Sequence, residues 1–291
     1  MTTQHMLSYE DVAACFTPRV ADSHKGTYGH LLAVCGSVGM AGAAILSARA
    51  ALRGGVGLLT VALPESIYSI VAGSVPEALF LPLPENEQGR LSHTALPILR
   101  QALKGKTALL VGCGLGCCED TQIIVRELLL QADCPKVLDA DGINAVARHI
   151  DVLETAFSSL IITPHPAEMS RLCGSTVDTV QADRISVATA FAKQYDVTVA
   201  LKGHHTVVAD ATQYRINPTG NAGMATGGSG DVLAGMIASF AAQGMSPFDA
   251  AMCGVYLHGL AGDMAAKRCS QHAMLPSDMI EELGSVFLKL E

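Results

Sequence analysis

The clearest chemical signal in the sequence is a glycine-rich run at residues 217–231, which reads NPTGNAGMATGGSGD. Three of its last five residues are glycines, and a segment with helical spacing of apolar residues follows directly. Glycines leave backbone N–H groups uncovered, and at the start of a helix these donors and the positive end of the helix dipole favour a bound anion. A carboxylate beside that anion, Asp231, is unfavourable unless it takes a proton from an attacking hydroxyl. The run therefore predicts a phosphate site with Asp231 as its general base.

Two further polar residues are expected to lie near this phosphate site. Lys202 ends a β-rich run and precedes Gly203, and a flexible ammonium group suits a phosphate. His165 lies between two prolines on a rigid turn, which indicates a positioned polar contact. Simpler interpretations remain open for all three residues: Lys202 as a solvated lysine, His165 as a structural histidine, and Asp231 as an acid that only begins a helix.

Several familiar ligand motifs do not occur in the sequence. Gly112–Gly116 has the pattern GxGxG instead of the GxGxxG of a dinucleotide-binding turn, and no acidic residue ends a strand about 20 residues later. The GxxxxGK[ST] pattern is also missing, which excludes a P-loop NTPase. No histidine or cysteine pattern has metal-ligand spacing, so any divalent ion is expected to be Mg²⁺ that arrives with phosphate oxygens.

The composition limits the possible partners and the compartment. Of 291 residues, 49% are hydrophobic and 16% charged, and the formal net charge is −8. The apolar content excludes a disordered chain, and the negative charge argues against binding to nucleic acid or an anionic membrane. Residues 1–24 show no secretory signal, and no apolar run reaches the ~18 residues of a membrane span, so we expect a cytoplasmic protein.

The nine cysteines are scattered and none has CxxC spacing, which favours reduced thiols. A redox or metal cluster formed by Cys113, Cys117 and Cys118 remains an alternative, although their spacing fits no zinc pattern.

Short apolar runs alternate with segments of helical period, which predicts an α/β fold with a largely parallel sheet. The expected strands are Leu31–Cys35, Leu58–Ala62, Ala108–Val111, Val137–Leu138, Leu160–Thr163 and Val197–Leu201, with a hairpin of Thr206–Ala209 and Gln213–Ile216. Helices are expected at 41–53, 119–131, 142–149, 166–172 and 178–194, and the last third of the chain is helical, including Pro276–Leu288. We expect one domain over 10–290 after an N-terminal extension at 1–9. Polar and glycine clusters follow four of the strands, at the edge where parallel sheets bind ligands.

These motifs resemble those of the ribokinase-like superfamily and, within it, the ADP/ATP-dependent NAD(P)H-hydrate dehydratases. The similarity extends from about Lys25 to Ala266 and depends most on Thr163–Glu168, TPHPAE, and on Gly227–Gly235, GGSGDVLAG. Other matching segments are Lys25–His30, Gly54–Leu58, Gly112–Gly116, Asp139–Gly142, Lys202–Gly203 and Tyr256–Gly259. The resemblance implies a three-layer αβα fold with a mostly parallel central sheet.

The resemblance also implies a reaction. NAD(P)H that has added water carries a hydroxyl beside the ring nitrogen; phosphorylation of this hydroxyl by ADP, or by ATP in some relatives, makes it a good leaving group. Loss of phosphate then restores NAD(P)H and leaves AMP. Phosphoryl transfer needs mainly positioning and neutralised charge, which these parts and Mg²⁺ would supply.

By the same analogy, each candidate residue has an expected role. Asp231 would be catalytic, and an anion hole would consist of Gly227, Gly228, Ser229 and Gly230. The hydrate would contact Ala43, Gly114, Gly116, Asn144, His165 and Asp231. The adenine nucleotide would lie along Lys202, Gly203, His204, His205, Thr206 and Gly230.

The resemblance further implies a homo-oligomer, often a tetramer in the family. Relatives often carry an upstream epimerase domain, for which the roughly 25 residues before the first motif leave no room; we therefore expect action on the S epimer and a separate epimerase. Two alternatives remain: a ribokinase-like kinase of a vitamin precursor, whose product stays phosphorylated, and a nucleotide-binding protein that has lost catalysis.

Overall fold

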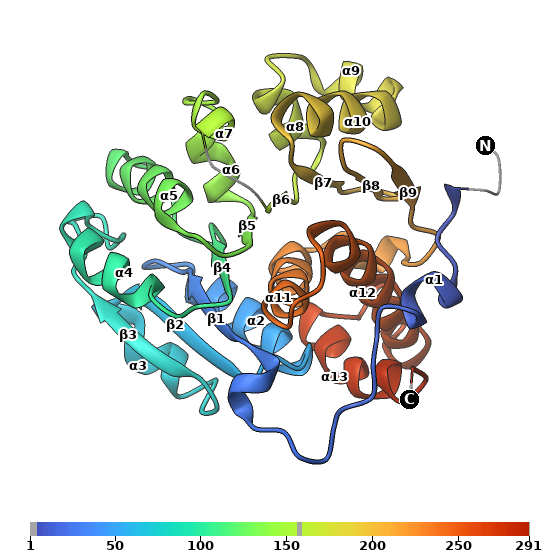
Figure 1. The fold of residues 1–291 in the computed structure, drawn as a ribbon, viewed down its shortest axis with the longest axis horizontal. Helices are drawn as coiled ribbons and strands as arrows, with labels where there is room; N and C mark the ends of the chain where they lie inside the picture. The colour runs from blue at the N-terminus through green and yellow to red at the C-terminus, as the bar shows by residue number, and fades with distance from the viewer. Residues whose placement is uncertain (1–4, 156–158, 291) are drawn as a thin grey trace.

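In the computed structural model, which describes residues 5–155 and 159–290, one sheet of nine strands lies between two layers of helices (Figure 1). The strand order is β3-β2-β1-β4-β5-β6-β7-β8-β9. The strands are β1 His30–Val34, β2 Leu58–Pro64, β3 Leu79–Leu83, β4 Ala108–Val111, β5 Lys136–Leu138, β6 Leu160–Ile162, β7 Thr198–Leu201, β8 Val207–Ala209 and β9 Tyr214–Ile216. All neighbours from β3 to β7 pair in parallel, and β8 and β9 add an antiparallel hairpin at the other edge.

Each face of the sheet has its own hydrophobic core, because the central strands are apolar on both sides. In β1, Leu31 and Ala33 belong to one core and Leu32 and Val34 to the other. The first core contains α1 Tyr9–Ala13, α2 Ala41–Arg53, α3 Tyr68–Ala72, α11 Ser229–Ala242, α12 Pro247–Cys269 and α13 Pro276–Phe287. The second contains α4 Leu96–Leu103, α5 Glu119–Gln131, α6 Asp141–Val146, α7 Val152–Thr155, α8 Pro166–Leu172, α9 Val177–Ala182 and α10 Arg184–Tyr195. Short 3₁₀ turns are η2 Lys25–Tyr28, η3 Glu65–Ile67, η4 His93–Ala95 and η5 Ala222–Met224.

Helix α11 occupies the centre of the first layer and brings the glycine-rich run to the sheet. It packs against α2 and α12 and lies over β4 and β5 (Figure 1). Of its fourteen residues, only two are not buried, Gly230 and Asp231 in the first turn. The helix is therefore a core helix whose amino end alone reaches the ligand edge of the sheet.

The α/β fold and the parallel sheet confirm the sequence prediction, as do the hairpin and the helices at 41–53, 119–131 and 166–172. The single helix predicted at 178–194 is wrong: α9 ends at Ala182, and the Asp183 side chain caps α10 by accepting from the Ser186 amide. Strand β3 and helix α4 were not predicted. Pro82 within β3 is tolerated because this strand lies at the edge of the sheet.

At the amino end, residues 1–4 of the predicted extension lie outside the described residues. The Leu7 amide donates to the carbonyl of Ile216, the last residue of β9, and Tyr9 begins α1. Within the two described ranges, no helix has the length and hydropathy needed to cross a membrane.

Candidate active site

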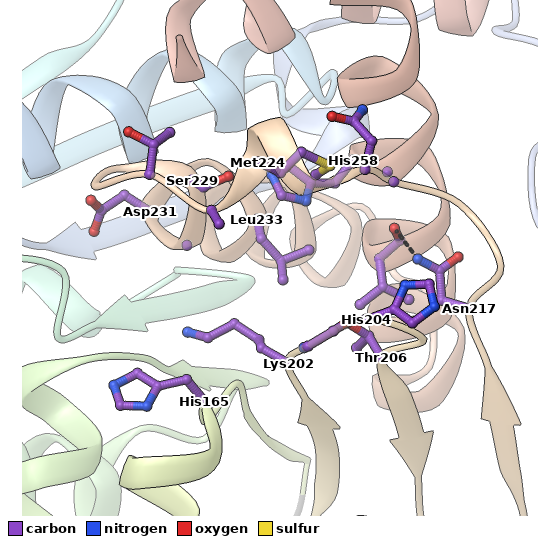
Figure 2. A pocket seen from close by; sticks show the side chains of 18 of the residues that line it. His165, Lys202, His204, Thr206, Asn217, Met224, Ser229, Asp231, Leu233 and His258 are labelled. Carbon is purple, nitrogen blue, oxygen red and sulfur yellow. Dashed lines mark hydrogen bonds between the residues drawn. The ribbon is translucent and has the colours of Figure 1, made fainter. Parts of the chain in front are cut away.

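A cavity of about 870 Å³ opens at the carboxyl ends of β5, β6 and β7, where the amino end of α11 meets the sheet (Figure 2). Five groups of residues line it. They are Asp139 and Ala140; His165, Pro166 and Glu168; Lys202–Thr206; most of Asn217–Asp231; and, from the helices α11 and α12, Leu233, Val255, His258 and Gly259. The predicted anion hole and the predicted nucleotide segment, Lys202 to Thr206, thus lie in one cavity.

The amino end of α11 is built as an anion site. Gly228 begins the helix with φ +95°, a conformation that favours glycine, and a Cβ there would lie 2.5 Å from Leu46 Cδ1. No side chain caps the helix. The Ser229 amide donates to the Thr226 carbonyl, at 3.4 Å, which leaves the amides of Gly230 and Asp231 available to a ligand. Gly227 has open space where a side chain would be, and a Cβ on Gly230 would lie 3.3 Å from Lys202 Nζ. The glycines therefore let an anion approach the backbone and the lysine together.

Asp231 faces the cavity from the first turn of α11 (Figure 2). Burial and the negative charge of Asp139 raise its pKa to about 6, while the Cys113 thiol and Lys202 act in the opposite direction. A carboxylate with this pKa is largely ionised at neutral pH and basic enough to accept a proton from a hydroxyl. The geometry and the pKa both suit the role of a general base.

Lys202 takes part in an ion-pair network that the sequence did not predict. Its Nζ lies 2.7 Å from Asp139 Oδ1 and 3.9 Å from Glu168 Oε2. Burial lowers its pKa, but the two carboxylates outweigh this effect and raise it. Thr163 Oγ1 also donates to Asp139 Oδ1, at 2.6 Å. The network fixes a fully charged ammonium group at the wall of the cavity.

His165 begins α8 and is held by that helix. Its Nδ1 accepts from the amides of Ala167 and Glu168, while Glu168 accepts from the His165 amide in a capping box. Burial and the charge of Lys202 lower the pKa of His165. The imidazole is therefore neutral and is fixed as the cap of α8, which agrees with the structural alternative, and it also lines the cavity.

The remaining hydrate candidates, Ala43, Gly114, Gly116 and Asn144, are not among the residues that line the cavity. A Cβ built on Gly114 would be 2.7 Å from the Cβ of Ala43, so these two candidates are in contact. The Gly116 amide donates to Asp141 Oδ2, at 2.7 Å. Asn144 instead accepts from Arg171 Nη1, at 2.8 Å, and is engaged in holding α6 against α8.

Cys113 joins the two regions. It follows β4 on the same loop as Gly114; its thiol donates to Asp139 Oδ2, at 3.7 Å, and its sulfur lies within 4.8 Å of a carboxylate oxygen of Asp231. The loop that carries Gly114 therefore reaches the wall of the cavity near Asp231.

Comparison with known proteins gives a consistent result. The family model described as NAD(P)H-hydrate dehydratase matches residues 31–284. The chain belongs to the NAD(P)H-hydrate dehydratase family. A bifunctional NAD(P)H-hydrate repair enzyme of Moorella thermoacetica is 46% identical over 94% of this chain and 52% of its own length. An ADP-dependent (S)-NAD(P)H-hydrate dehydratase of Neisseria meningitidis serogroup B is 40% identical over 86% of this chain and 81% of its own.

Solved structures support the same family. The ADP/ATP-dependent NAD(P)H-hydrate dehydratase of Bacillus subtilis, co-crystallised with ATP/Mg²⁺, superposes over the full length of both chains with a TM-score of 0.84 and 31% identity. The chain spans about half the length of the bifunctional relatives that it matches.

A group of residues at the wall of the cavity could be considered as metal ligands. Among the described residues, one group of three possible ligands has its ligand atoms within 4.8 Å of one another: Cys113, Asp139 and Asp231. A thiol is a poor ligand for Mg²⁺, and Asp139 is already paired with Lys202 and Thr163. These residues do not fit a protein-held Mg²⁺.

The three cysteines of the loop after β4 do not gather into a cluster. Cys113 contacts Asp139, Cys117 donates to Asp141, and Cys118 pairs with Thr121. Each thiol has its own partner, and all nine cysteines are free. The geometry gives the alternative of a redox or metal cluster no support.

Proposed function

We propose that the protein dehydrates the S epimer of NAD(P)H hydrate at the expense of ADP or ATP. With ADP, the products are NAD(P)H, AMP and phosphate. The observation that carries this proposal is the position of Asp231: a carboxylate with a raised pKa, at the cavity wall, in the same helical turn as the uncapped amides of α11.

The reaction would proceed in two steps. Asp231 accepts the proton of the hydrate hydroxyl, whose oxygen attacks the terminal phosphorus of the nucleotide; the bridging P–O bond breaks and AMP leaves. The C–O bond of the hydrate, whose oxygen now carries the phosphoryl group, then breaks, pushed by the lone pair of the ring nitrogen, and the neighbouring carbon loses a proton to solvent. The double bond of the dihydropyridine ring is restored, and phosphate departs.

The residues of the chain act on this sequence by position and charge. The amides of Gly227–Gly230 hold the transferring phosphoryl group, and Lys202 adds a positive charge from the other wall. The hydrate would bind along Ala43, Gly114 and Gly116, with His165 as a neutral contact, while the nucleotide lies along Lys202–Thr206. Asn144, bound to Arg171, would act on the hydrate only after exchanging that partner. Mg²⁺ would arrive with the nucleotide phosphates and neutralise their charge.

The deciding experiment separates a dehydratase from a kinase. The S hydrate of NADH is incubated with ADP or ATP, and absorbance at the NADH band is followed together with phosphate release. A dehydratase restores NADH and releases one phosphate for each NADH formed. A conventional kinase would consume nucleotide without restoring absorbance, and a protein that only binds nucleotide would do neither.

Two further features belong to this proposal. A separate epimerase would supply the S epimer from the R epimer. The protein would work in the cytoplasm as a homo-oligomer, with a tetramer as the expected form; its mass in solution can be measured directly by light scattering.

A further inference from the structure

Two residues that line the cavity each carry a buried polar side-chain atom without a hydrogen-bond partner. Among the described residues, only three buried side-chain nitrogen or oxygen atoms are unpaired, and two of these, His258 Nε2 and Ser229 Oγ, belong to residues that line the cavity. Both residues are more than nine-tenths buried, at 7% and 8% exposure. Because an unpaired buried polar atom is costly, two such atoms in one cavity indicate a ligand that would pair them.

The position of His258 suggests which part of a ligand it meets. It lies on α12, beside the first turn of α11, between the Asp231 end of the cavity and the end formed by His204, Thr206 and Asn217 (Figure 2). The wall around it is apolar and includes Met224, Leu233 and Val255. An apolar wall with one or two placed polar atoms is typical of a site for an uncharged, partly aromatic group.

The charge state of His258 is consistent with such a group. Burial lowers its pKa to about 4, and Lys202 acts in the same direction, against a hydrogen bond with the Ser229 backbone. The ring is therefore neutral at physiological pH, and with one ring nitrogen engaged by the Ser229 backbone it offers a ligand the other nitrogen, Nε2. A hydroxyl or an amine of a ligand can pair with this nitrogen.

The segment that carries Met224 is anchored on α12, which fixes this part of the wall. Asn217 Nδ2 donates to the Val255 carbonyl, at 3.1 Å, and Thr219 Oγ1 donates to the Tyr256 carbonyl, at 2.8 Å. The part of the cavity around His258 is thus already ordered before a ligand binds, which reduces the conformational entropy lost on binding.

We propose that His258 Nε2, together with Ser229 Oγ, binds the uncharged nucleoside part of the adenine nucleotide, the ribose hydroxyls or the purine edge. This inference rests on the proposed function, since it takes the nucleotide as the occupant of the cavity. His258 is then a nucleotide-positioning residue: it sets where the transferable phosphate lies relative to Asp231, without touching the reacting atoms.

The first test uses the wild-type protein, so that it does not depend on the folding of a variant. The imidazole nitrogens of ¹⁵N-histidine-labelled protein are followed by NMR during titration with AMP and, separately, with pyrophosphate. The Nε2 signal of His258, assigned by its loss in the His258→Gln variant, should move with AMP and stay in place with pyrophosphate. A signal that moves with neither ligand, or equally with pyrophosphate, overturns the proposal.

The second test compares variants by calorimetry. His258→Leu should weaken AMP binding about tenfold, as expected when a ligand group loses its partner, and leave pyrophosphate binding within about twofold of wild type. His258→Gln, which keeps a polar group, should recover most of the loss, and the KM for ADP should rise more than kcat falls. The same change at the exposed His272 is the matched control.

The outcomes distinguish the two proposals. If the wild-type protein binds no AMP, the proposed function fails and this inference with it. If the wild-type protein binds AMP and the His258→Leu and Ser229→Ala variants bind it equally well, only the inference on His258 fails.

Discussion

Charges of both signs surround Asp231, and their combined effect on its pKa determines the pH at which it can act as a base. Burial and Asp139 disfavour its ionised form, whereas Lys202 and the Cys113 thiol favour it. Lys202 is in turn shared with Asp139 and Glu168, so it does not fully neutralise any one of them. A carboxylate that is only partly compensated retains its basicity, which a fully ion-paired carboxylate would lose.

The Asp231→Asn variant tests the role of the base. The amide cannot accept the hydroxyl proton, so turnover should fall by roughly 10²- to 10⁴-fold, the usual range for a general base. Affinity for AMP, measured by calorimetry, should remain nearly unchanged because the amides of α11 are retained. The variant should be no less stable than wild type at pH 7.5, because burial disfavours the charge it removes. Turnover like that of the wild type would contradict the assignment.

The pH dependence of the reaction should report the same carboxylate. Its pKa is raised to about 6 and its ionised form is the active one, so kcat/KM should be level above pH 7 and fall about tenfold per unit below pH 6. The pKa of His165 is lowered and that of Lys202 raised, so neither should titrate between pH 7 and 8. Initial rates of phosphate release at saturating nucleotide give the profile.

The Asp139→Asn variant provides the control for that profile. Asp139 raises the pKa of Asp231, so its removal should move the acid limb to lower pH. A limb that stays in place, or an activity that does not change between pH 5 and 7, would contradict the assignment of the limb to Asp231.

Single residues were predictable from the sequence only where a local pattern marks them. Asp231 and the glycines stand together in one short run, and the two prolines mark His165. The pairing of Lys202 with Asp139 joins residues 63 positions apart and depends on the strand order, which no local pattern encodes. His258 lies in the matching segment Tyr256–Gly259 but received no role, because within an apolar helix a histidine looks like a core residue.

Among the strands, the sequence predicts those that are buried on both faces of the sheet and misses the exposed edge strand. The continuous apolar runs of β1, β4 and β6 were recognisable, whereas β3 is an edge strand with an exposed Leu79 and an internal proline. The break between α9 and α10 needs only one residue, Asp183, whose side chain caps the second helix without a glycine or proline to mark it.

The placement of α11 depends on a close contact with α2, which the Gly235→Ala variant tests. A Cβ at position 235 would lie 2.2 Å from the backbone oxygen of Ser47, so the two helices must separate. We expect a loss of unfolding free energy of about 1–3 kcal/mol and a lower kcat, because the amino end of the helix moves with it. Denaturant unfolding and initial rates measure both.

Gly284→Ala provides the matched control on another helix. Position 284 lies on α13 with nothing within 4 Å of the added Cβ, so the same change should stabilise the protein by about 0.5–1 kcal/mol through helix propensity. Equal effects at 235 and 284 would show that the contact between α11 and α2 does not position the site.

For the whole molecule, the overall charge opposes the proposed ligands. The chain carries a net charge of −8, whereas both proposed ligands, the NAD(P)H hydrate and the adenine nucleotide, are polyanions. Its lysine is shared between two carboxylates, and Asp231 adds a third acid to the same region. Attraction must therefore act at short range, from the backbone amides, the fixed ammonium of Lys202 and the Mg²⁺ that arrives with the phosphates, while the long-range field of the protein is repulsive.

This arrangement predicts an unusual salt dependence of nucleotide binding. A basic anion-binding surface loses affinity as salt rises, because screening weakens its attraction. Here screening should weaken a long-range repulsion and leave the buried short-range contacts nearly unchanged. Between 20 and 200 mM monovalent salt at fixed saturating Mg²⁺, the Kd for ADP should therefore stay constant or decrease, and the association rate should rise. Calorimetry and stopped-flow mixing give the two quantities, and a Kd that increases severalfold would show that a basic surface, not the amino end of α11, captures the nucleotide.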